Sequence, residues 1–225
     1  MWQRLPDTGG LKSMNKIEDA FKNKKAFIPF VTAGDPSLDV TRELILAMQE
    51  AGADLIEIGI PFSDPVAEGP VIQEADDRAL SAGVTTDKIF DMVDDIADKI
   101  HVPIVFMTYI NPIYVYGVEK FAKRAKACGA AGVIVPDVPF EEKEEIRGSF
   151  EAEGLVVISM VAPTSADRVR MIAKEAKGFL YCVSSLGVTG VRTEIGTAIG
   201  DLIQTVKEEC SIPCAIGFGI STPEQ

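Results

Sequence analysis

The sequence predicts an α/β protein that folds as a parallel (β/α)8 barrel, a TIM barrel, and three observations favour this fold class. Short apolar segments alternate with amphipathic ones along the 225 residues, which is typical of strands that each lead into a helix. Glycines at positions 52, 129, 154 and 178 stand between a predicted helix and the next predicted strand, where a left-handed helix end is common. No predicted strand is followed by a GxGxxG loop, which favours a barrel over a doubly wound sheet.

Seven strands are expected, each with a continuous apolar centre, at Ala26–Thr32, Asp54–Ile60, Ile104–Thr108, Gly132–Val135, Val156–Met160, Phe179–Val183 and Cys214–Gly217. Amphipathic helices are expected between them at Leu38–Glu50, Thr86–Ile100, Val118–Cys128, Glu141–Glu153, Ala166–Ala176 and Gly196–Glu209. The wider gap between the second and third strands predicts an additional helix over Gly69–Ala82.

An eight-stranded barrel continues beyond its seventh strand, whereas Gln225 follows that strand closely. We therefore expect residues 14–225 to form an incomplete barrel domain that lacks the last helix–strand–helix portion. Residues 1–13 show no hydrophobic periodicity, and we expect them to be a disordered N-terminal extension.

Composition narrows the classes of partner and cofactor. Lys and Arg number 22 against 34 Asp and Glu, a net charge of −12, which argues against nucleic acid and anionic membranes as partners. A small phosphorylated molecule is still possible, because helix N-termini bind phosphate through backbone N–H groups. Four cysteines without a CxxC pair, together with a single histidine, argue against a metal site and predict free thiols in a reducing cytoplasm. No apolar segment approaches the roughly 20 residues of a membrane helix.

Two carboxylates are the strongest candidates for chemistry. Glu57 lies at the end of the second predicted strand, where a buried parallel strand is normally apolar. Glu68 follows eleven residues later on a loop with three prolines. Two acids at the C-terminal end of a barrel suit general acid–base catalysis. The alternative from these residues alone is an ion-paired or capping Glu57 and a solvated Glu68.

Six motifs occur in order, each at a loop between a strand and its helix. They are Phe30-Val31-Thr32-Ala33-Gly34-Asp35-Pro36, Glu57 to Gln73, Tyr109-Ile110-Asn111-Pro112, Pro136-Asp137-Val138-Pro139, Ser184-Ser185-Leu186-Gly187-Val188-Thr189-Gly190 and Gly217-Phe218-Gly219-Ile220-Ser221. On these motifs the chain, from about Met14 to Gln225, resembles the tryptophan synthase alpha chain family.

The resemblance implies a lyase of tryptophan biosynthesis that cleaves indole-3-glycerol phosphate to indole and glyceraldehyde 3-phosphate by a retro-aldol reaction. It implies no cofactor for this alpha reaction, because pyridoxal phosphate belongs to a beta chain with which the alpha chain forms an α2β2 heterotetramer. Glu57 matches the family's strand-two catalytic acid, and Glu68 occupies a position where the family usually has Asp. The extra methylene of Glu68 changes the reach of this carboxylate, and a misplacement of roughly 1 Å can cost on the order of a hundredfold in rate.

The resemblance also implies further site residues. An apolar slot for indole is expected from residues whose type is equally compatible with barrel packing, namely Phe27, Met107, Tyr109, Ile134 and Phe218. Tyr181 is expected near a glycerol hydroxyl and Gly190 and Gly219 at the phosphate, while Thr189 would contact the Asp64 region when its loop closes as a lid. Asp64, Asn111 and Pro139 match the surface that docks on the beta chain.

Two rival functions are kept. One is a non-catalytic partner that docks on and activates a beta chain, because the incomplete barrel lacks part of the phosphate site. The other is a different phosphate-binding barrel, such as a sugar-phosphate isomerase or an aldolase. A Schiff-base aldolase needs a lysine at a strand end, and none of the seven predicted strands ends in one.

Overall fold

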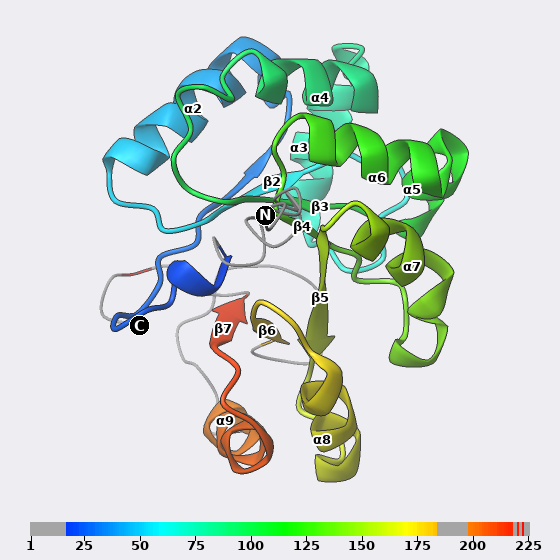
Figure 1. Ribbon diagram of the computed structural model, residues 1–225. Coiled ribbons are helices and arrows are strands. Elements are labelled where there is room, and N and C mark those ends of the chain that lie inside the picture. Colours follow the sequence, from blue (N-terminus) through cyan, green and yellow to red (C-terminus); the bar gives the residue numbers. More distant parts are fainter. Residues whose placement is uncertain (1–16, 184–197, 218–219, 221, 223–225) are drawn as a thin grey trace, which may run out of the picture.

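The computed structural model describes residues 17–183, 198–217, 220 and 222. Within these residues seven parallel strands form one sheet in the order of the sequence, so that each strand pairs with the next. The strands are β1 (Phe30–Thr32), β2 (Ile56–Gly59), β3 (Ile104–Met107), β4 (Gly132–Ile134), β5 (Val156–Val161), β6 (Leu180–Val183) and β7 (Cys214–Gly217). Figure 1 shows the sheet curling, with helices arranged around its outer side. The predicted barrel architecture is confirmed in this part of the chain.

The helices agree with the sequence pattern except in three regions, one of which is the predicted helix Glu141–Glu153, whose start is a separate 3-10 turn. They are α2 (Leu38–Glu50), α3 (Pro70–Ser81), α4 (Thr86–Asp94), α5 (Ile110–Tyr116), α6 (Val118–Ala127), the 3-10 turn η1 (Phe140–Glu142), α7 (Glu144–Ala152), α8 (Ala166–Glu175) and α9 (Ala198–Glu209). Helix α4 ends six residues before the predicted Ile100. Helix α5 was expected as a loop, because seven residues are too few for a visible period. Pro112 fits there in the first turn, where its missing N–H costs nothing.

Local signals explain where several helices begin and end. The side chains of Ser37, Thr85 and Ser165 each accept a hydrogen bond from a backbone N–H in the first turn of α2, α4 and α8. Such caps satisfy N–H groups that have no partner within the helix. Gly52 and Gly129, after α2 and α6, adopt φ of +98° and +90°. The prediction of left-handed glycines at these helix ends is confirmed.

Alternate residues of each strand pack on opposite sides of the sheet. Inward side chains form one apolar cluster that includes Leu55, Val105, Ile134, Ile158 and Tyr181. Outward side chains of β2, β3 and β4 pack with α2 and α4 to α7 in a second cluster, and those of β5 and β6 pack with α8 and α9 in a third. Glu57 therefore lies on the inward side of β2, two residues after Leu55 and two before Gly59.

The N-terminal end of the curled sheet is filled by apolar side chains. Ile17 is fully buried in the inner cluster, and the rings of Phe21 and Phe179 lie with their centroids 5.4 Å apart. Residues 1–16 are outside the described part of the chain, so the predicted N-terminal extension stays a prediction.

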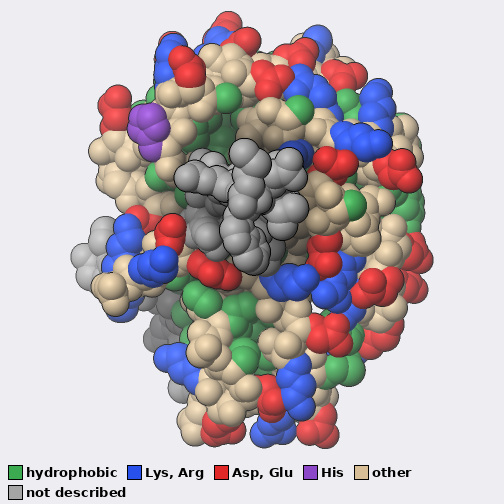
Figure 2. Space-filling model, viewed as in Figure 1, with side chains coloured by type: hydrophobic (Ala, Val, Ile, Leu, Met, Phe, Trp, Pro, Cys, Tyr) green, Lys and Arg blue, Asp and Glu red, His purple; other side chains and the backbone are tan. Residues whose placement is uncertain are grey.

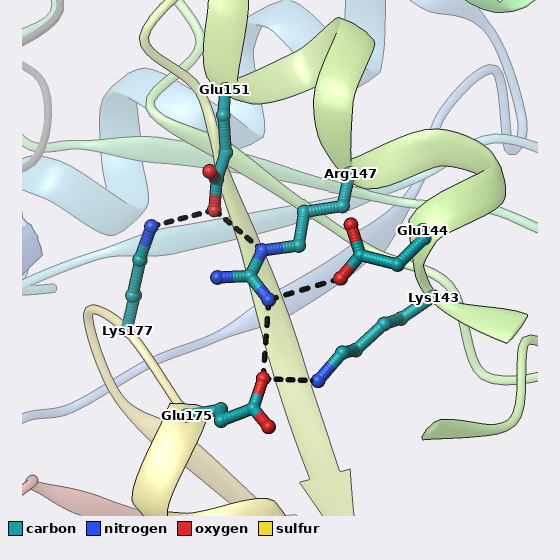
Figure 3. A network of polar contacts seen from close by, with 6 residues as sticks. All are labelled: Lys143, Glu144, Arg147, Glu151, Glu175 and Lys177. Carbon is teal, nitrogen blue, oxygen red and sulfur yellow. Dashed lines mark hydrogen bonds and ion pairs between the residues drawn. The ribbon is translucent and has the colours of Figure 1, made fainter. Parts of the chain in front are cut away.

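The surface is charged and mixed in sign. Figure 2 shows Lys and Arg interspersed with Asp and Glu on the face in view. A network of six such residues joins α7, α8 and the loop between α8 and β6 (Figure 3). Arg147 pairs with Glu144, Glu151 and Glu175 at 3.2, 2.8 and 3.3 Å. Lys177 pairs with Glu151 at 2.7 Å, and Lys143 pairs with Glu175. Exposed pairs contribute about 0–1 kcal/mol each.

All four cysteines are free thiols. Cys128 packs in the outer cluster beneath α6, whereas Cys182, Cys210 and Cys214 pack in the cluster beneath α8 and α9. Among the described residues no group of His, Cys, Asp and Glu is arranged to hold a metal ion, and no described helix is long and apolar enough to span a membrane.

Candidate active site

Glu57 is a buried acid with no counter-ion among the residues that the structure describes. Its register neighbours are Phe30 on β1 and Val105 on β3, so apolar side chains flank it on both sides. The side chain is only 4 % exposed. Burial raises the pKa of its carboxyl to about 8, and no cation among the described residues lowers it. Glu57 is therefore protonated at neutral pH and can donate a proton.

Glu68 is the second buried acid, 8 % exposed, and it lies just before the N-terminus of α3. Tyr109 shapes its loop, because the Ala67 N–H donates to the Tyr109 hydroxyl at 3.0 Å. The Gln73 side chain donates to the Glu68 carbonyl at 2.8 Å. Burial, followed by the nearby Asp76, raises the pKa of Glu68 to about 7. Its Oε2 atom is buried without a hydrogen-bond partner among the described residues.

Tyr181 lies close to both acids on the inward side of β6. Burial raises the pKa of its hydroxyl, and the charges of Glu57 and Glu68 raise it further. The hydroxyl therefore stays protonated and can donate a hydrogen bond. Its ring fits only because β7 has Gly217 beside it, where a Cβ atom would lie 2.0 Å from the hydroxyl oxygen.

Apolar side chains surround the acids. A cavity of about 10 Å³, room for about one water molecule, is lined by Phe30, Gly59, Ile60, Glu68, Ile72, Asp76, Met107, Thr108 and Tyr109. Phe30 occupies its place because Gly59 has no side chain, since a Cβ there would lie 2.5 Å from the ring. A larger cavity of about 290 Å³ lies elsewhere, between β5, α7 and α8.

The structure brings most predicted site residues of the described chain together, but not Phe27. Met107, Tyr109, Ile134 and Tyr181 lie in or beside the barrel interior with the two acids. Phe27 lies before the N-terminal end of β1, where its carbonyl accepts from the Asp54 N–H, and it is 58 % exposed. Its assignment to the indole slot is wrong, because sites in such barrels form at the opposite ends of the strands.

Phe30 takes the place that was assigned to Phe27. It lies three residues further along, on the inward side of β1. Sites in these barrels form at the C-terminal ends of the strands. This rule favours Phe30 over Phe27 from the sequence alone, because Phe30 lies nearer to that end of the predicted strand. The sequence reasoning also missed Gly59 and Gly217, whose lack of a side chain admits two aromatic rings, and Asp76, a buried acid of α3.

Four predicted site residues, Thr189, Gly190, Phe218 and Gly219, lie outside the described residues. Their roles at the substrate and the phosphate stay predictions.

The residues predicted to dock on a partner are exposed on segments that follow neighbouring strands. Asp64, Asn111 and Pro139 follow β2, β3 and β4, with Asn111 in the first turn of α5. Large apolar side chains are exposed on the segments after β2 and β3, with Val66, Val71 of α3 and Val115 of α5 at 71, 72 and 82 %. The Asp137 side chain joins two of these segments by accepting from the Ile110 N–H at 3.0 Å. An apolar surface with a polar surround suits protein–protein contact.

Comparison with known proteins gives one family throughout. Residues 17–225 match the family model described as "Tryptophan synthase alpha chain". The tryptophan synthase alpha chain of Lacticaseibacillus casei is 47 % identical over 212 residues, which cover 94 % of this chain and 80 % of that one. The alpha chain of Halalkalibacterium halodurans is 49 % identical over 214 residues, 94 % of this chain and 81 % of that one.

Solved structures agree with these relatives. Tryptophan synthase of Mycobacterium tuberculosis superposes with a TM-score of 0.84 at 33 % identity, over 92 % of this chain and 80 % of that one. A tryptophan synthase complex from Pyrococcus furiosus superposes with a TM-score of 0.81 at 40 % identity, over 88 % of this chain and 80 % of that one.

Proposed function

Since this chain belongs to the tryptophan synthase alpha chain family, we propose that its barrel cleaves indole-3-glycerol phosphate to indole and glyceraldehyde 3-phosphate. The observation that supports this most strongly is the pair of buried acids, Glu57 and Glu68, with Tyr181 close to both of them. A retro-aldol cleavage needs a proton donor at indole carbon three, a base for a glycerol hydroxyl and an acceptor for the indole N–H. Glu57 and Glu68 can supply these groups, and the Tyr181 hydroxyl can donate a hydrogen bond to the glycerol part of the substrate.

Glu57 is proposed as the acid and base of the reaction. Because it is protonated at neutral pH, it can transfer its proton to carbon three of the indole ring. The resulting carboxylate then accepts the proton of the glycerol hydroxyl as the carbon–carbon bond breaks and the aldehyde forms. Glu57 therefore regains its proton by the end of each turnover, and no other base is required.

Glu68 is proposed to accept a hydrogen bond from the indole N–H. Protonation of carbon three places positive charge on the ring nitrogen, and a fixed carboxylate stabilises that charge best where water is excluded. The space beside Glu68 holds about 10 Å³, so this end of the site is nearly dry. An indole ring is larger than this space, so substrate binding requires the surrounding side chains, among them the partly buried Phe30, to move.

The glycerol phosphate is proposed to extend from Tyr181 towards Gly190 and Gly219. Glycines let backbone N–H groups approach a phosphate, which needs no lysine or arginine. The alpha reaction is proposed to need no cofactor, with pyridoxal phosphate confined to the beta chain. No described strand ends in a lysine, which disfavours a Schiff-base aldolase. We also propose that the protein acts in the cytoplasm.

A tryptophan synthase beta chain is the proposed partner, in an α2β2 assembly. One of the similar structures, from Pyrococcus furiosus, is described as a tryptophan synthase α2β2 complex with mutual activation. The exposed residues Asp64, Asn111 and Pro139, together with the three exposed valines, are the proposed docking surface. Glu68 follows the same strand as Asp64, so docking and catalysis are adjacent.

The decisive measurement is indole formation from indole-3-glycerol phosphate with and without a beta chain. Glu57→Gln is expected to lower kcat by about 10²–10⁴-fold, the usual contribution of a general acid or base. The exposed Glu50→Gln on α2 is the matched control and should keep full activity. If Glu57→Gln matches the wild type, the acid–base assignment is wrong. If the wild-type chain releases no indole yet activates a beta chain, the non-catalytic docking function replaces it.

A further inference from the structure

Asp76 is a third buried carboxyl beside the proposed active site, and the reaction above gives it no role. It lies on the inner side of α3 between Ala75 and Ala79, is 6 % exposed, and lines the same cavity as Glu68. A charged carboxylate buried without a cation is costly. The question is therefore which groups surround Asp76 and in what state they hold it.

The surroundings of Asp76 contain hydrogen bonds but no available cation among the described residues. The Phe62 N–H donates to its carboxyl group. Arg78, two residues along α3, is engaged by Asp35 of the β1–α2 loop through two contacts of 2.8 Å each. The remaining charged neighbours, Asp77 and Glu68, have the same sign as Asp76.

Glu68 faces the same cavity with one oxygen unsatisfied. Its Oε2 is buried and accepts no hydrogen bond from the described residues. Two ionised carboxylates cannot satisfy each other, because both only accept hydrogen bonds. One protonated carboxyl changes this, because it has an O–H donor and removes the repulsion between like charges.

The fold indicates which of the two carboxyls keeps the proton. Glu68 precedes the N-terminus of α3, where the helix dipole favours a negative charge. Asp76 lies two turns further into the helix, beyond the first turn in which the dipole acts. Asp137, whose side chain accepts a hydrogen bond from the Ile110 N–H, acts in the opposite sense, because its charge raises the pKa of Glu68; its effect is the smallest of the contributions to that pKa.

We propose that Asp76 is a positioning residue for Glu68, and that the two carboxyl groups share one proton, held on Asp76 and directed at Glu68 Oε2 directly or through one water. This proposal deepens the function above, because it keeps Glu68 ionised and oriented for the indole N–H. Burial raises the pKa of both carboxyls to about 7, and the charge of Asp76 contributes to that of Glu68. The pair therefore carries one negative charge over the pH range in which the enzyme would work.

The direct test is infrared spectroscopy of protein labelled with ¹³C in the aspartate carboxyl groups. At pH 6 the wild type should show the carbonyl band of a protonated aspartic acid, and Asp76→Asn should lose it. The matched control is Asp77→Asn, the exposed neighbour on the same helix, which should keep the band. In Glu68→Gln the band should disappear at a lower pH than in the wild type, because the like charge is gone. A wild type without a protonated aspartic acid at pH 6 would overturn the proposal.

Kinetics test whether the donor matters. Asp76→Asn keeps an N–H donor towards Glu68 and should retain most of the wild-type kcat/KM for indole formation, whereas Asp76→Ala should lose about ten- to hundredfold, as expected for a lost hydrogen bond to a charged group. Equal activity of the two variants would overturn the positioning role. The infrared result does not depend on turnover, so it tests the shared proton even if the proposed reaction is wrong. The infrared measurement alone tests the shared proton if the Asp76→Ala variant does not fold.

Discussion

Glu57 should make the protein less stable at alkaline pH, and its removal should reverse this effect. The group is 4 % exposed and its pKa is about 8 in the fold, against 4.5 for an ordinary glutamate. Below pH 4.5 it is neutral in both folded and unfolded chains and has no effect. Between pH 4.5 and 8 the Glu57 carboxyl ionises in the unfolded chain but not in the folded one, so the free energy of unfolding falls as pH rises. Well above pH 8 the carboxyl is ionised in both states, and the destabilisation no longer changes with pH.

The magnitude follows from the size of the shift. One pKa unit corresponds to about 1.4 kcal/mol, so a change from 4.5 to about 8 corresponds to at most ~5 kcal/mol. Most of this difference, ~4 kcal/mol, develops between about pH 5 and pH 9. Glu57→Gln cannot ionise and keeps nearly the same volume. It should therefore gain up to ~4 kcal/mol relative to the wild type over that pH range.

Urea unfolding of both proteins at several pH values measures this difference. Glu68 and Asp76 also have raised pKa values, but both proteins contain them, so their contributions largely cancel. Glu50→Gln, an exposed substitution, is the control and should follow the wild type at every pH. A stability difference between Glu57→Gln and the wild type that does not change with pH would refute the reasoning that burial alone holds Glu57 neutral.

Three further changes test other parts of the structure. Gly217→Ala should lower indole formation at least tenfold while α8 and α9 stay folded, because its Cβ would lie 2.0 Å from the Tyr181 hydroxyl; steady-state kinetics and circular dichroism check this, and normal activity would contradict the close approach. Glu68→Asp keeps the charge and should retain indole formation within about tenfold, whereas Glu68→Gln should lose about a hundredfold or more; equal losses in the two variants would contradict the need for an anion. Arg147→Ala removes the centre of the network in Figure 3 and should lower the free energy of unfolding by about 1 kcal/mol at low salt and by less at high salt, which urea unfolding at two ionic strengths measures.

The alternation of apolar and amphipathic segments was enough to predict the order of strands and helices. Helix α2 and strand β7 have the predicted bounds, because their caps and flanking turns are local signals. Glu57 was found for a related reason, since a carboxylate within a buried strand breaks a local pattern; the structure places it second in β2 and not at the C-terminal end that was predicted. Helix α5 escaped prediction because one or two turns give no readable period.

The choice between Phe27 and Phe30 shows where local information ends. Both aromatic residues belong to the same predicted strand, and both are compatible with an apolar slot. The structure separates them, because β1 spans only Phe30–Thr32 and Phe27 is exposed at the other end. Strand length and register depend on pairing with β2, which no single segment specifies.

The sequence by itself determined the parallel barrel class, the presence of Glu57 in a buried strand and the loop that contains Glu68. Only the tertiary structure decided that Asp76 of α3 is buried beside Glu68, and that Gly217 of β7 makes room for Tyr181 of the neighbouring strand β6. The physical reason is that burial, charge proximity and steric fit arise between segments that are far apart in the chain. A sequence pattern shows which face of a helix is apolar, but the groups packed against that face decide whether an aspartate on it keeps its proton.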